Sequence, residues 1–229
     1  MRHAVVMAAG EGTRLRPLTE RWPKPVLPID GRAVIATLLR ELADAGCELA
    51  VVVTGHLAEQ VEELVGDGSA FGLEARFARQ PGVLGSADAV QRGIASGAEP
   101  PFLVSAADTV FSPGDAWRFA AAFSAGSAAG AIALRRGPGT QAVRVSDGLV
   151  RKLLEDDVAN PLSAAPLWAL GPELVPLLEG LSGPPFELAH TLQRAIDAGL
   201  PIAGIEIGPT RDLTDPLDLV EENFPYLRR

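Results

Sequence analysis

The first half of this chain alternates short apolar segments with segments whose apolar residues recur at helical spacing. Buried strands are predicted at residues 4–6, 49–54 and 102–105, and a further strand is predicted at 73–78. Helices are predicted at residues 34–43, 57–65 and 87–94. Strands that alternate with helices form a parallel sheet with helices on both faces. The chain is therefore predicted to have an α/β fold, a Rossmann-like three-layer α/β/α arrangement around a mainly parallel sheet.

The second half is less regular and predicts a small antiparallel β subregion. Short strands are expected at 130–135, 141–145 and 149–153, joined by turns at Gly137-Pro138-Gly139 and Asp147-Gly148. Further elements are expected as helices at 172–178, 186–198 and 216–224 and a strand at 202–207. The turn-rich segment 180–185 is too short to separate domains, so residues 1–229 are expected to form a single domain.

Bulk properties narrow the class of protein. The formal net charge of −9 argues against nonspecific nucleic-acid binding, since the phosphate backbone favours a basic face. No stretch of eighteen apolar residues is present, so no membrane span is expected. The single cysteine, Cys47, is expected to be a small buried side chain. The strand pattern starts at the N-terminus and leaves no room for a signal peptide, and together these features predict a cytoplasmic protein.

The loop after the first strand concentrates glycines and positive charge. The run from Met7 to Ile29 contains Gly10, Gly12 and the cations Arg14, Arg16 and Lys24. Glycines allow backbone amides to approach a phosphate chain, and fixed cations stabilise its charge. A strand followed by such a loop indicates a nucleoside triphosphate site.

Two better-known phosphate loops are excluded by spacing. A P-loop places Lys and Ser or Thr directly after its second glycine, and Gly12 is followed by Thr13. A dinucleotide fingerprint has a third small residue where this chain has Leu15. An ordinary glycine turn with solvated arginines is the simplest alternative, but Thr13-Arg14 and the turn Pro23-Lys24-Pro25 make it the weaker one.

The whole run resembles the signature of the sugar-1-phosphate nucleotidylyltransferases. The chain reads MAAGEGTRLRPLT from Met7 and PKPVLPIDG from Pro23, against the family pattern L-A-A-G-x-G-T-R-L-x-P-L-T and P-K-x-L-x-P-[IV]-x-G. The resemblance implies a nucleotide-diphospho-sugar transferase-like fold of the short, glucose-1-phosphate thymidylyltransferase-like type, without the β-helix domain of some relatives. It implies catalytic roles at the phosphates for Arg14 and Lys24. It also implies a nucleotide-binding segment of Ala8, Ala9, Gly10, Gly12 and Thr13.

Two aspartates that follow strands are candidate Mg²⁺ ligands. Asp108 comes directly after an apolar strand, where it could cap a turn or hold a cation. The segment Ala107-Asp108-Thr109 resembles the family's G-D-x metal motif, with alanine in place of glycine. The segment from Pro209 to Leu219 resembles the family's W-x-D motif, which puts Asp212 at the second metal aspartate. We therefore predict Mg²⁺ as cofactor, with Asp108 also catalytic.

A third motif indicates where a base would bind. Gln80-Pro81-Gly82-Val83-Leu84-Gly85 resembles the family's Q-P-x-x-x-G. In the family the glutamine amide pairs with a pyrimidine edge, and the glycine lets the base approach the backbone. An amide offers both a donor and an acceptor, which suits an imide edge. A solvated glutamine in a turn would be the simpler interpretation without this motif.

The acceptor side departs from the family pattern. Many members carry an E-K-P motif whose lysine grips the sugar phosphate, and the matching place here reads Glu155-Asp156-Asp157. Lys152 or Arg151 could substitute, although strand alternation would put only one of them on the right face. The acceptor is therefore left open.

These observations predict a nucleotidyltransferase that uses Mg²⁺, a nucleoside triphosphate and a phosphorylated small molecule, with a sugar 1-phosphate favoured. dTTP or UTP is favoured as donor. The alternatives are a CTP-dependent cytidylyltransferase for phosphocholine or inositol phosphate, and a noncatalytic nucleotide-binding subunit. A redox enzyme is disfavoured by the Leu15 spacing. The sequence leaves the base and the oligomeric state open.

Overall fold

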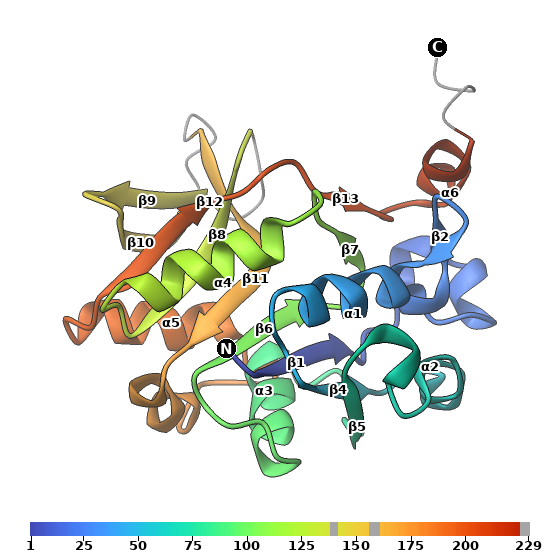
Figure 1. Cartoon of the computed structure of the whole chain (residues 1–229), viewed down its shortest axis with the longest axis horizontal. Helices are drawn as coiled ribbons and strands as arrows, with labels where there is room; N and C mark the ends of the chain where they lie inside the picture. The colour runs from blue at the N-terminus through green and yellow to red at the C-terminus, as the bar shows by residue number, and fades with distance from the viewer. Residues whose placement is uncertain (138–141, 156–160, 225–229) are drawn as a thin grey trace.

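One nine-stranded mixed sheet runs through the molecule. The computed structural model describes residues 1–137, 142–155 and 161–224 (Figure 1). The strand order is β5-β4-β1-β6-β11-β8-β12-β10-β9. Two short two-stranded sheets, β2–β3 and β7–β13, lie outside it.

The first four strands form the parallel half of the sheet. They are β5 (Glu74–Arg79), β4 (Leu49–Thr54), β1 (His3–Ala8) and β6 (Phe102–Ala106). β1 is central and pairs in parallel with β4 on one side and β6 on the other. Its first apolar residues, Ala4, Val5 and Val6, are fully buried, as a strand with helices on both faces requires. The predicted parallel sheet is confirmed.

The remaining strands form a mixed half around β11 (Leu162–Leu170), which is antiparallel to both neighbours, β6 and β8 (Gly130–Arg136). β12 (Ile202–Glu206) runs parallel to β8. β10 (Leu149–Glu155) pairs antiparallel with β12 and with β9 (Ala142–Ser146), and β9 also pairs with β11, so this half curls back on itself. The predicted antiparallel subregion is present, but its central strand β11 was not predicted.

Local chemistry explains two details of this half. Asp147 and Gly148 join β9 to β10 with φ of 56° and 73°, the left-handed pair that a two-residue hairpin needs. The predicted helix at 172–178 is instead a 3-10 segment, Pro172–Leu178, because Pro176 inside it cannot donate a backbone hydrogen bond.

Helices cover both faces of the sheet, which confirms the three-layer arrangement. α1 (Val34–Asp44), α2 (Ala58–Val65) and α4 (Asp115–Ala125) pack on one face, with Leu38 and Phe119 in that core. α3 (Ser86–Ala95) and α5 (Leu188–Asp197) pack on the other, with Val90 and Leu192 in that core. Figure 1 shows α1 and α4 in front of the sheet and α5 behind it.

A third, smaller apolar cluster supports the glycine-rich loop. It consists of Leu15, Leu27, Ile29, Val34, Val110 and Leu213. These residues come from the loop, from β2 (Pro28–Ile29), from β7 (Thr109–Val110) and from the segment after β13 (Arg211–Asp212). β3 (Arg32–Ala33) pairs with β2. The cluster joins the loop to the β7–β13 pair, although these segments are far apart in the sequence.

The C-terminal helix α6 (Pro216–Asn223) begins as the sequence predicts. Asp215 caps it, with its carboxylate accepting from the N–H of Leu217 at 2.8 Å, and Asp218 completes a capping box. Among the described residues no helix is long and apolar enough to span a bilayer.

Several sequence expectations fall outside the described residues. These are Pro138 and Gly139 of the first turn, Gln141, and Asp156 and Asp157 of the acceptor motif.

Candidate active site

Hydrogen bonds of the Thr19 and His56 side chains hold the glycine-rich loop in place. Gly12 has a φ of +61°, and a Cβ on it would lie 2.9 Å from Cγ2 of Thr19. The Thr19 hydroxyl donates to the Gly12 carbonyl at 2.9 Å, and the ring Nε2 of His56 lies 2.6 Å from the Thr19 carbonyl. Gly10 differs, because no heavy atom lies within 4 Å of its Cβ position. The loop is therefore held in place at Gly12, whereas the space around Gly10 is open.

A hollow of about 270 Å³ opens above this loop. We call it the loop hollow, and its lining includes Ala8, Gly10, Gly12, Thr13, Arg14 and Lys24. Ala9, also expected here, does not line it; its carbonyl accepts the N–H of His56 at 3.4 Å.

A second hollow of about 600 Å³ adjoins the first. We call it the strand hollow, and its lining includes Ser86, Arg135, Trp168, Glu187 and Asp212. The two hollows share five residues, Arg14, Lys24, Ala106, Asp108 and Thr214. The site is thus one continuous depression with two compartments that meet beside Asp108.

The two predicted metal aspartates lie together at this junction. β7 and β13 pair antiparallel with Asp212 opposite Thr109, which brings residues 103 positions apart into contact. The buried Thr109 hydroxyl donates to Asp212 and lies 3.4 Å from Oδ1 of Asp108, so it sits between the two carboxylates. The side chains of Asp108 and Asp212 are 35% and 29% exposed, which leaves their oxygens accessible from the hollows.

The predicted cations occupy different environments. Lys24 forms an ion pair with Asp108, and only 12% of its side chain is exposed. Arg14 lines both hollows and makes no ion pair with any other residue in the described ranges. Arg16 forms an ion pair with Glu11 at 3.1 Å on the surface. Arg14 is therefore available for a ligand, whereas Arg16 is not directed into either hollow.

Arg135 is a lining cation that the sequence did not single out. Its guanidinium donates to the Thr210 hydroxyl at 2.7 Å and to Asp212 at 3.3 Å. It is the second-last residue of β8 and lies on the face that also carries Ala131 and Ala133, because side chains alternate along a strand. That alternation is the only sequence signal that could have separated it from its neighbour Arg136.

Gln80 and Gly85 are not among the residues that line either hollow, although Ser86, next to Gly85, lines the strand hollow. The Gln80 amide donates to the Gly85 carbonyl at 3.0 Å and to Asp88 at 2.7 Å. Gly85 has a φ of +98°, and a Cβ there would lie 2.4 Å from the Phe186 carbonyl oxygen. The glycine is thus required by the approach of the Phe186 backbone, and a base contact by Gln80 stays a prediction.

Asp88 explains how the Gln80 amide is held. Its carboxylate also accepts from Nε of Arg92 at 2.6 Å. Burial raises the pKa of Asp88, but the hydrogen bonds from Arg92 and Gln80 outweigh this and leave the pKa below its ordinary value. The Asp88 carboxylate is therefore ionised at neutral pH, and it keeps the Gln80 amide in one orientation.

Arg151 and Lys152, the expected substitutes for the missing acceptor lysine, lie on β10. Both are exposed, and neither belongs to the lining of the two hollows. The Arg151 guanidinium lies 3.9 Å from Asp147, at the hairpin turn.

Part of the strand-hollow lining is polar. The Ser86 hydroxyl donates to Glu187 at 2.5 Å and accepts the N–H of Leu188 at 2.8 Å. Trp168 on β11 belongs to the same lining. A lining that combines an indole with a carboxylate and a hydroxyl suits a ligand that carries both apolar and hydroxyl groups.

Comparison with known proteins is consistent with this geometry. A family model described as nucleotidyl transferase matches residues 3–141. The chain belongs to this family. It is 36% identical over 108 residues to the N-acetylmuramate alpha-1-phosphate uridylyltransferase of Neisseria meningitidis serogroup B, which covers 47% of each chain. The chain spans less than two thirds of the length of the curated relatives it matches.

Solved structures share the fold. A UDP-glucose pyrophosphorylase complexed with UDP-glucose superposes with a TM-score of 0.85 at 20% identity, over 99% of this chain and 98% of the other. The inositol-1-phosphate CTP transferase from T. maritima superposes with a TM-score of 0.81 at 22% identity, over 95% and 91% of the two chains. These similarities confirm the predicted fold class.

Proposed function

We propose that this chain is a Mg²⁺-dependent nucleotidylyltransferase that uses a nucleoside triphosphate, with dTTP or UTP favoured, and a sugar 1-phosphate. The products are a nucleoside-diphosphate sugar and pyrophosphate. The observation that carries the proposal is the meeting of the loop hollow and the strand hollow beside Asp108, with Arg14 and Lys24 in the lining of both. Two substrates that must react with each other need two compartments with a shared boundary.

The loop hollow suits the triphosphate. Gly10 leaves space above the backbone, Arg14 has no competing ion pair among the described residues, and Lys24 is held in place by Asp108. Close backbone approach and fixed cations are what a phosphate chain requires. The strand hollow, larger and with a polar wall, suits the acceptor.

The residues at the junction fit Mg²⁺. This ion is typically held by one or two carboxylates while substrate phosphates and waters complete its octahedron. Asp108 and Asp212 supply the two carboxylates, and the described residues contain no cluster of three or more His, Cys, Asp or Glu that could hold a metal alone. When bound, the ion would neutralise charge on the phosphates. Mg²⁺ affinity is accordingly expected to be weak without nucleotide and to rise when a triphosphate is added, as isothermal titration calorimetry would measure.

The reaction needs positioning more than covalent work from the protein. A phosphate oxygen of the acceptor attacks the α-phosphorus, the new P–O bond forms, and the bond to the β-phosphate oxygen breaks to release pyrophosphate. Arg14 and Lys24 stabilise the negative charge that develops on these phosphates. No side chain has to form a covalent intermediate.

A cytidylyltransferase acting on inositol phosphate or phosphocholine is the second candidate. Two observations favour it. The place of the family's acceptor lysine holds Asp156, and the fold is similar to that of the inositol-1-phosphate CTP transferase. An acceptor other than a hexose 1-phosphate would make different contacts at that place.

Pyrophosphate release tests the proposal. The purified protein is incubated with Mg²⁺, with ATP, CTP, GTP, UTP or dTTP, and with glucose 1-phosphate, mannose 1-phosphate, N-acetylmuramate 1-phosphate, inositol 1-phosphate or phosphocholine. Release with UTP or dTTP and a sugar 1-phosphate supports the first candidate, and release only with CTP and one of the last two acceptors supports the second. Triphosphate binding without release from any pair would contradict both and favour a noncatalytic nucleotide-binding subunit.

A further inference from the structure

Among the described residues, Arg135 is the cation that lines the strand hollow but not the loop hollow. The other cations of that lining, Arg14 and Lys24, are shared with the loop hollow. Its side chain is 32% exposed, so the guanidinium is partly shielded from solvent and still reachable from the hollow.

The guanidinium has donors to spare. Its two hydrogen bonds, to Thr210 and Asp212, both come from the same terminal nitrogen. Within the described ranges, Nε and the other terminal nitrogen donate to nothing. A guanidinium carries five N–H donors in a planar fork that matches two oxygens of a phosphate group. Thr210 and Asp212 therefore hold one branch of the fork while the rest remains open to a ligand.

The carboxylates of the strand hollow explain why the open N–H donors of Arg135 matter for binding a phosphate. The described residues of the lining include three carboxylates, from Asp108, Asp212 and Glu187. A phosphate monoester that enters beside them needs cationic partners, because like charges at short range repel. Arg135 supplies one, because it lines the strand hollow and does not line the loop hollow proposed for the triphosphate.

Resting on the proposed function, we propose that Arg135 binds the acceptor's phosphate with two parallel N–H donors. It performs the role for which the sequence offered only Arg151 or Lys152, and it does so from a different strand. Its contacts to Thr210 and Asp212 set the orientation of the fork, and the acceptor phosphate is thereby held next to Asp108, at the boundary of the two hollows.

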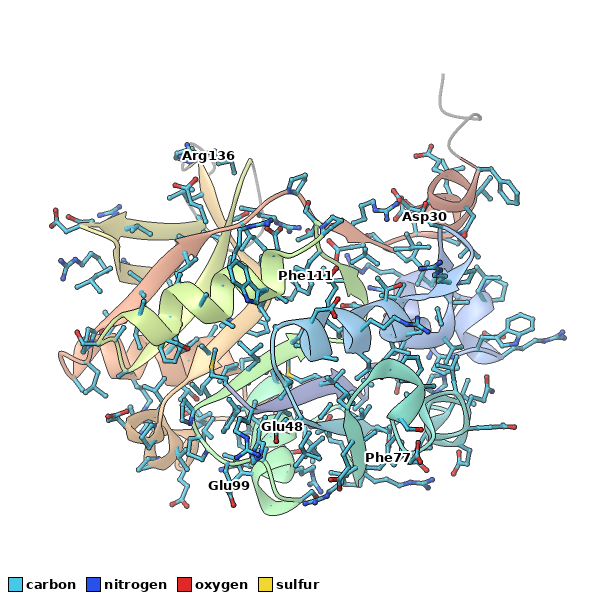
Figure 2. The ribbon with its side chains drawn as sticks, viewed as in Figure 1. Asp30, Glu48, Phe77, Glu99, Phe111 and Arg136 are labelled. Carbon is cyan, nitrogen blue, oxygen red and sulfur yellow. The ribbon has the colours of Figure 1, made fainter. Side chains whose placement is uncertain are left out.

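Arg136 provides a matched control. It is the next residue on β8, points to the opposite face, and forms an ion pair with Glu206 at 2.8 Å. Figure 2 shows it at the end of the strand, on the outer edge of the molecule. Arg136→Ala and Arg135→Ala remove the same charge from adjacent positions, so only a local contact can separate their effects.

Binding of phosphate monoesters tests the proposal without requiring turnover. Calorimetry measures the affinity of the full chain for glucose 1-phosphate, mannose 1-phosphate, N-acetylmuramate 1-phosphate, inositol 1-phosphate and phosphocholine. Arg135→Ala and Arg135→Lys should each weaken the best binder by about 10- to 100-fold, because a hydrogen-bonded charge pair is lost or its fork geometry is lost. Arg136→Ala and the double variant Arg151→Ala/Lys152→Ala should bind as the unmodified chain does.

A second measurement distinguishes phosphate binding by Arg135 from a role that is limited to positioning Asp212. If Arg135 only positioned Asp212, its variants would raise the Mg²⁺ concentration needed for half-maximal triphosphate binding. The proposal predicts that this concentration and the triphosphate affinity stay within about twofold. Equal monoester affinity in Arg135→Ala and the unmodified chain would overturn it, as would the absence of any monoester binding to the unmodified chain.

The outcomes also distinguish this proposal from the proposed function. Turnover that is unaffected by Arg135→Ala leaves the nucleotidylyltransferase standing and removes the role of Arg135. Monoester binding that depends on Arg135, together with no pyrophosphate release from any pair, leaves the phosphate site standing and removes the proposed reaction.

Discussion

The loop hollow and the strand hollow are built in opposite ways. The loop hollow draws most of its chemistry from one continuous stretch, Gly10 to Lys24, so its residues are neighbours in the sequence as well as in space. The strand hollow draws Ser86, Arg135, Trp168, Glu187 and Asp212 from five separate segments. The loop hollow can be predicted from a sequence motif. The strand hollow forms only when the mixed half of the sheet brings its separate segments together.

This difference in construction matches a difference between the two proposed substrates, of which one is constant across the family and the other varies. A triphosphate presents the same phosphate chain whatever its base, so one loop can serve a whole family. An acceptor differs from enzyme to enzyme, and a compartment assembled from scattered side chains can change one residue at a time. The following changes test whether the two compartments behave independently, beginning with the largest expected effect.

Changes at the junction should disable both compartments together. Asp108→Asn and Asp212→Asn should each lower kcat by more than about 100-fold, above the range for outer-shell metal partners, because each removes a charged ligand from the proposed Mg²⁺ site. Pyrophosphate release at saturating substrates measures this. Thr109→Ser, which keeps the bridging hydroxyl, serves as the control. Unchanged release in either aspartate variant would remove the metal assignment.

Arg14 lines both hollows, so its loss should be felt by both substrates. Arg14→Ala is expected to lower kcat/KM for triphosphate and acceptor by about 10- to 100-fold, since a charge-assisted hydrogen bond to phosphate is lost. Arg16→Ala, which removes the surface ion pair with Glu11, should leave both values unchanged. Steady-state kinetics with each substrate varied in turn separate the two variants, and equal losses in both would mean that only general positive charge matters.

Substitution of Gly10 should impair triphosphate binding in the loop hollow without changing the stability of the fold. Gly10→Ala is expected to change the free energy of unfolding by less than about 0.5 kcal/mol, because its Cβ meets no atom within 4 Å. The KM for the triphosphate should rise about tenfold, since the methyl group occupies the hollow. Gly12→Ala is the contrasting variant, and its φ of +61° and contact with Thr19 should cost about 1 kcal/mol or more in urea unfolding.

Replacing Asp88 should have the smallest effect, and it tests the hydrogen bonds that hold the Gln80 side chain. Asp88→Asn should lower stability at pH 7 by about 1 kcal/mol, because it weakens the hydrogen bonds with Arg92 and Gln80. The pKa of Asp88 is lowered in the folded chain, so its stabilising contribution is present above its unfolded pKa of about 4 and is lost as the pH falls through the folded pKa.

Thermal unfolding at pH 7 and at pH 3 measures this difference between the variant and the unmodified chain. The gap between their melting temperatures should be present at pH 7 and shrink at pH 3. A gap that is constant with pH would show that the Asp88 charge makes no contribution.

The sequence predicts the parallel half well because three of its four strands, β1, β4 and β6, are mostly buried and therefore apolar, while β5 lies at the partly exposed edge of the sheet. The strand at Leu49–Thr54 has the bounds that its uninterrupted apolar run predicts. In the mixed half the strand Leu162–Leu170 was missed because small residues and Pro166 weaken its pattern, and its place is set by pairing with β6 and β8. Helix α4 was also missed, since its alanine-rich segment Asp115–Ala125 gives a weak alternation of apolar and polar faces.

The candidate site follows the same division. The closeness of Asp108 and Asp212 could be expected because both follow strands and both match family motifs. Arg135 could not, because its hydrogen bond to Thr210 depends on a contact across 75 residues of sequence. The space occupied by the Phe186 backbone at Gly85 is likewise a property of the folded chain alone.

Two-substrate kinetics of Gly10→Ala and Arg135→Lys test whether the site is divided into two compartments, since each residue lines only one hollow. We expect Gly10→Ala to raise the KM for the triphosphate about tenfold with the acceptor KM unchanged, and Arg135→Lys to raise the acceptor KM at least tenfold with the triphosphate KM unchanged. Equal changes in both KM values in either variant would contradict the division of the site into two compartments.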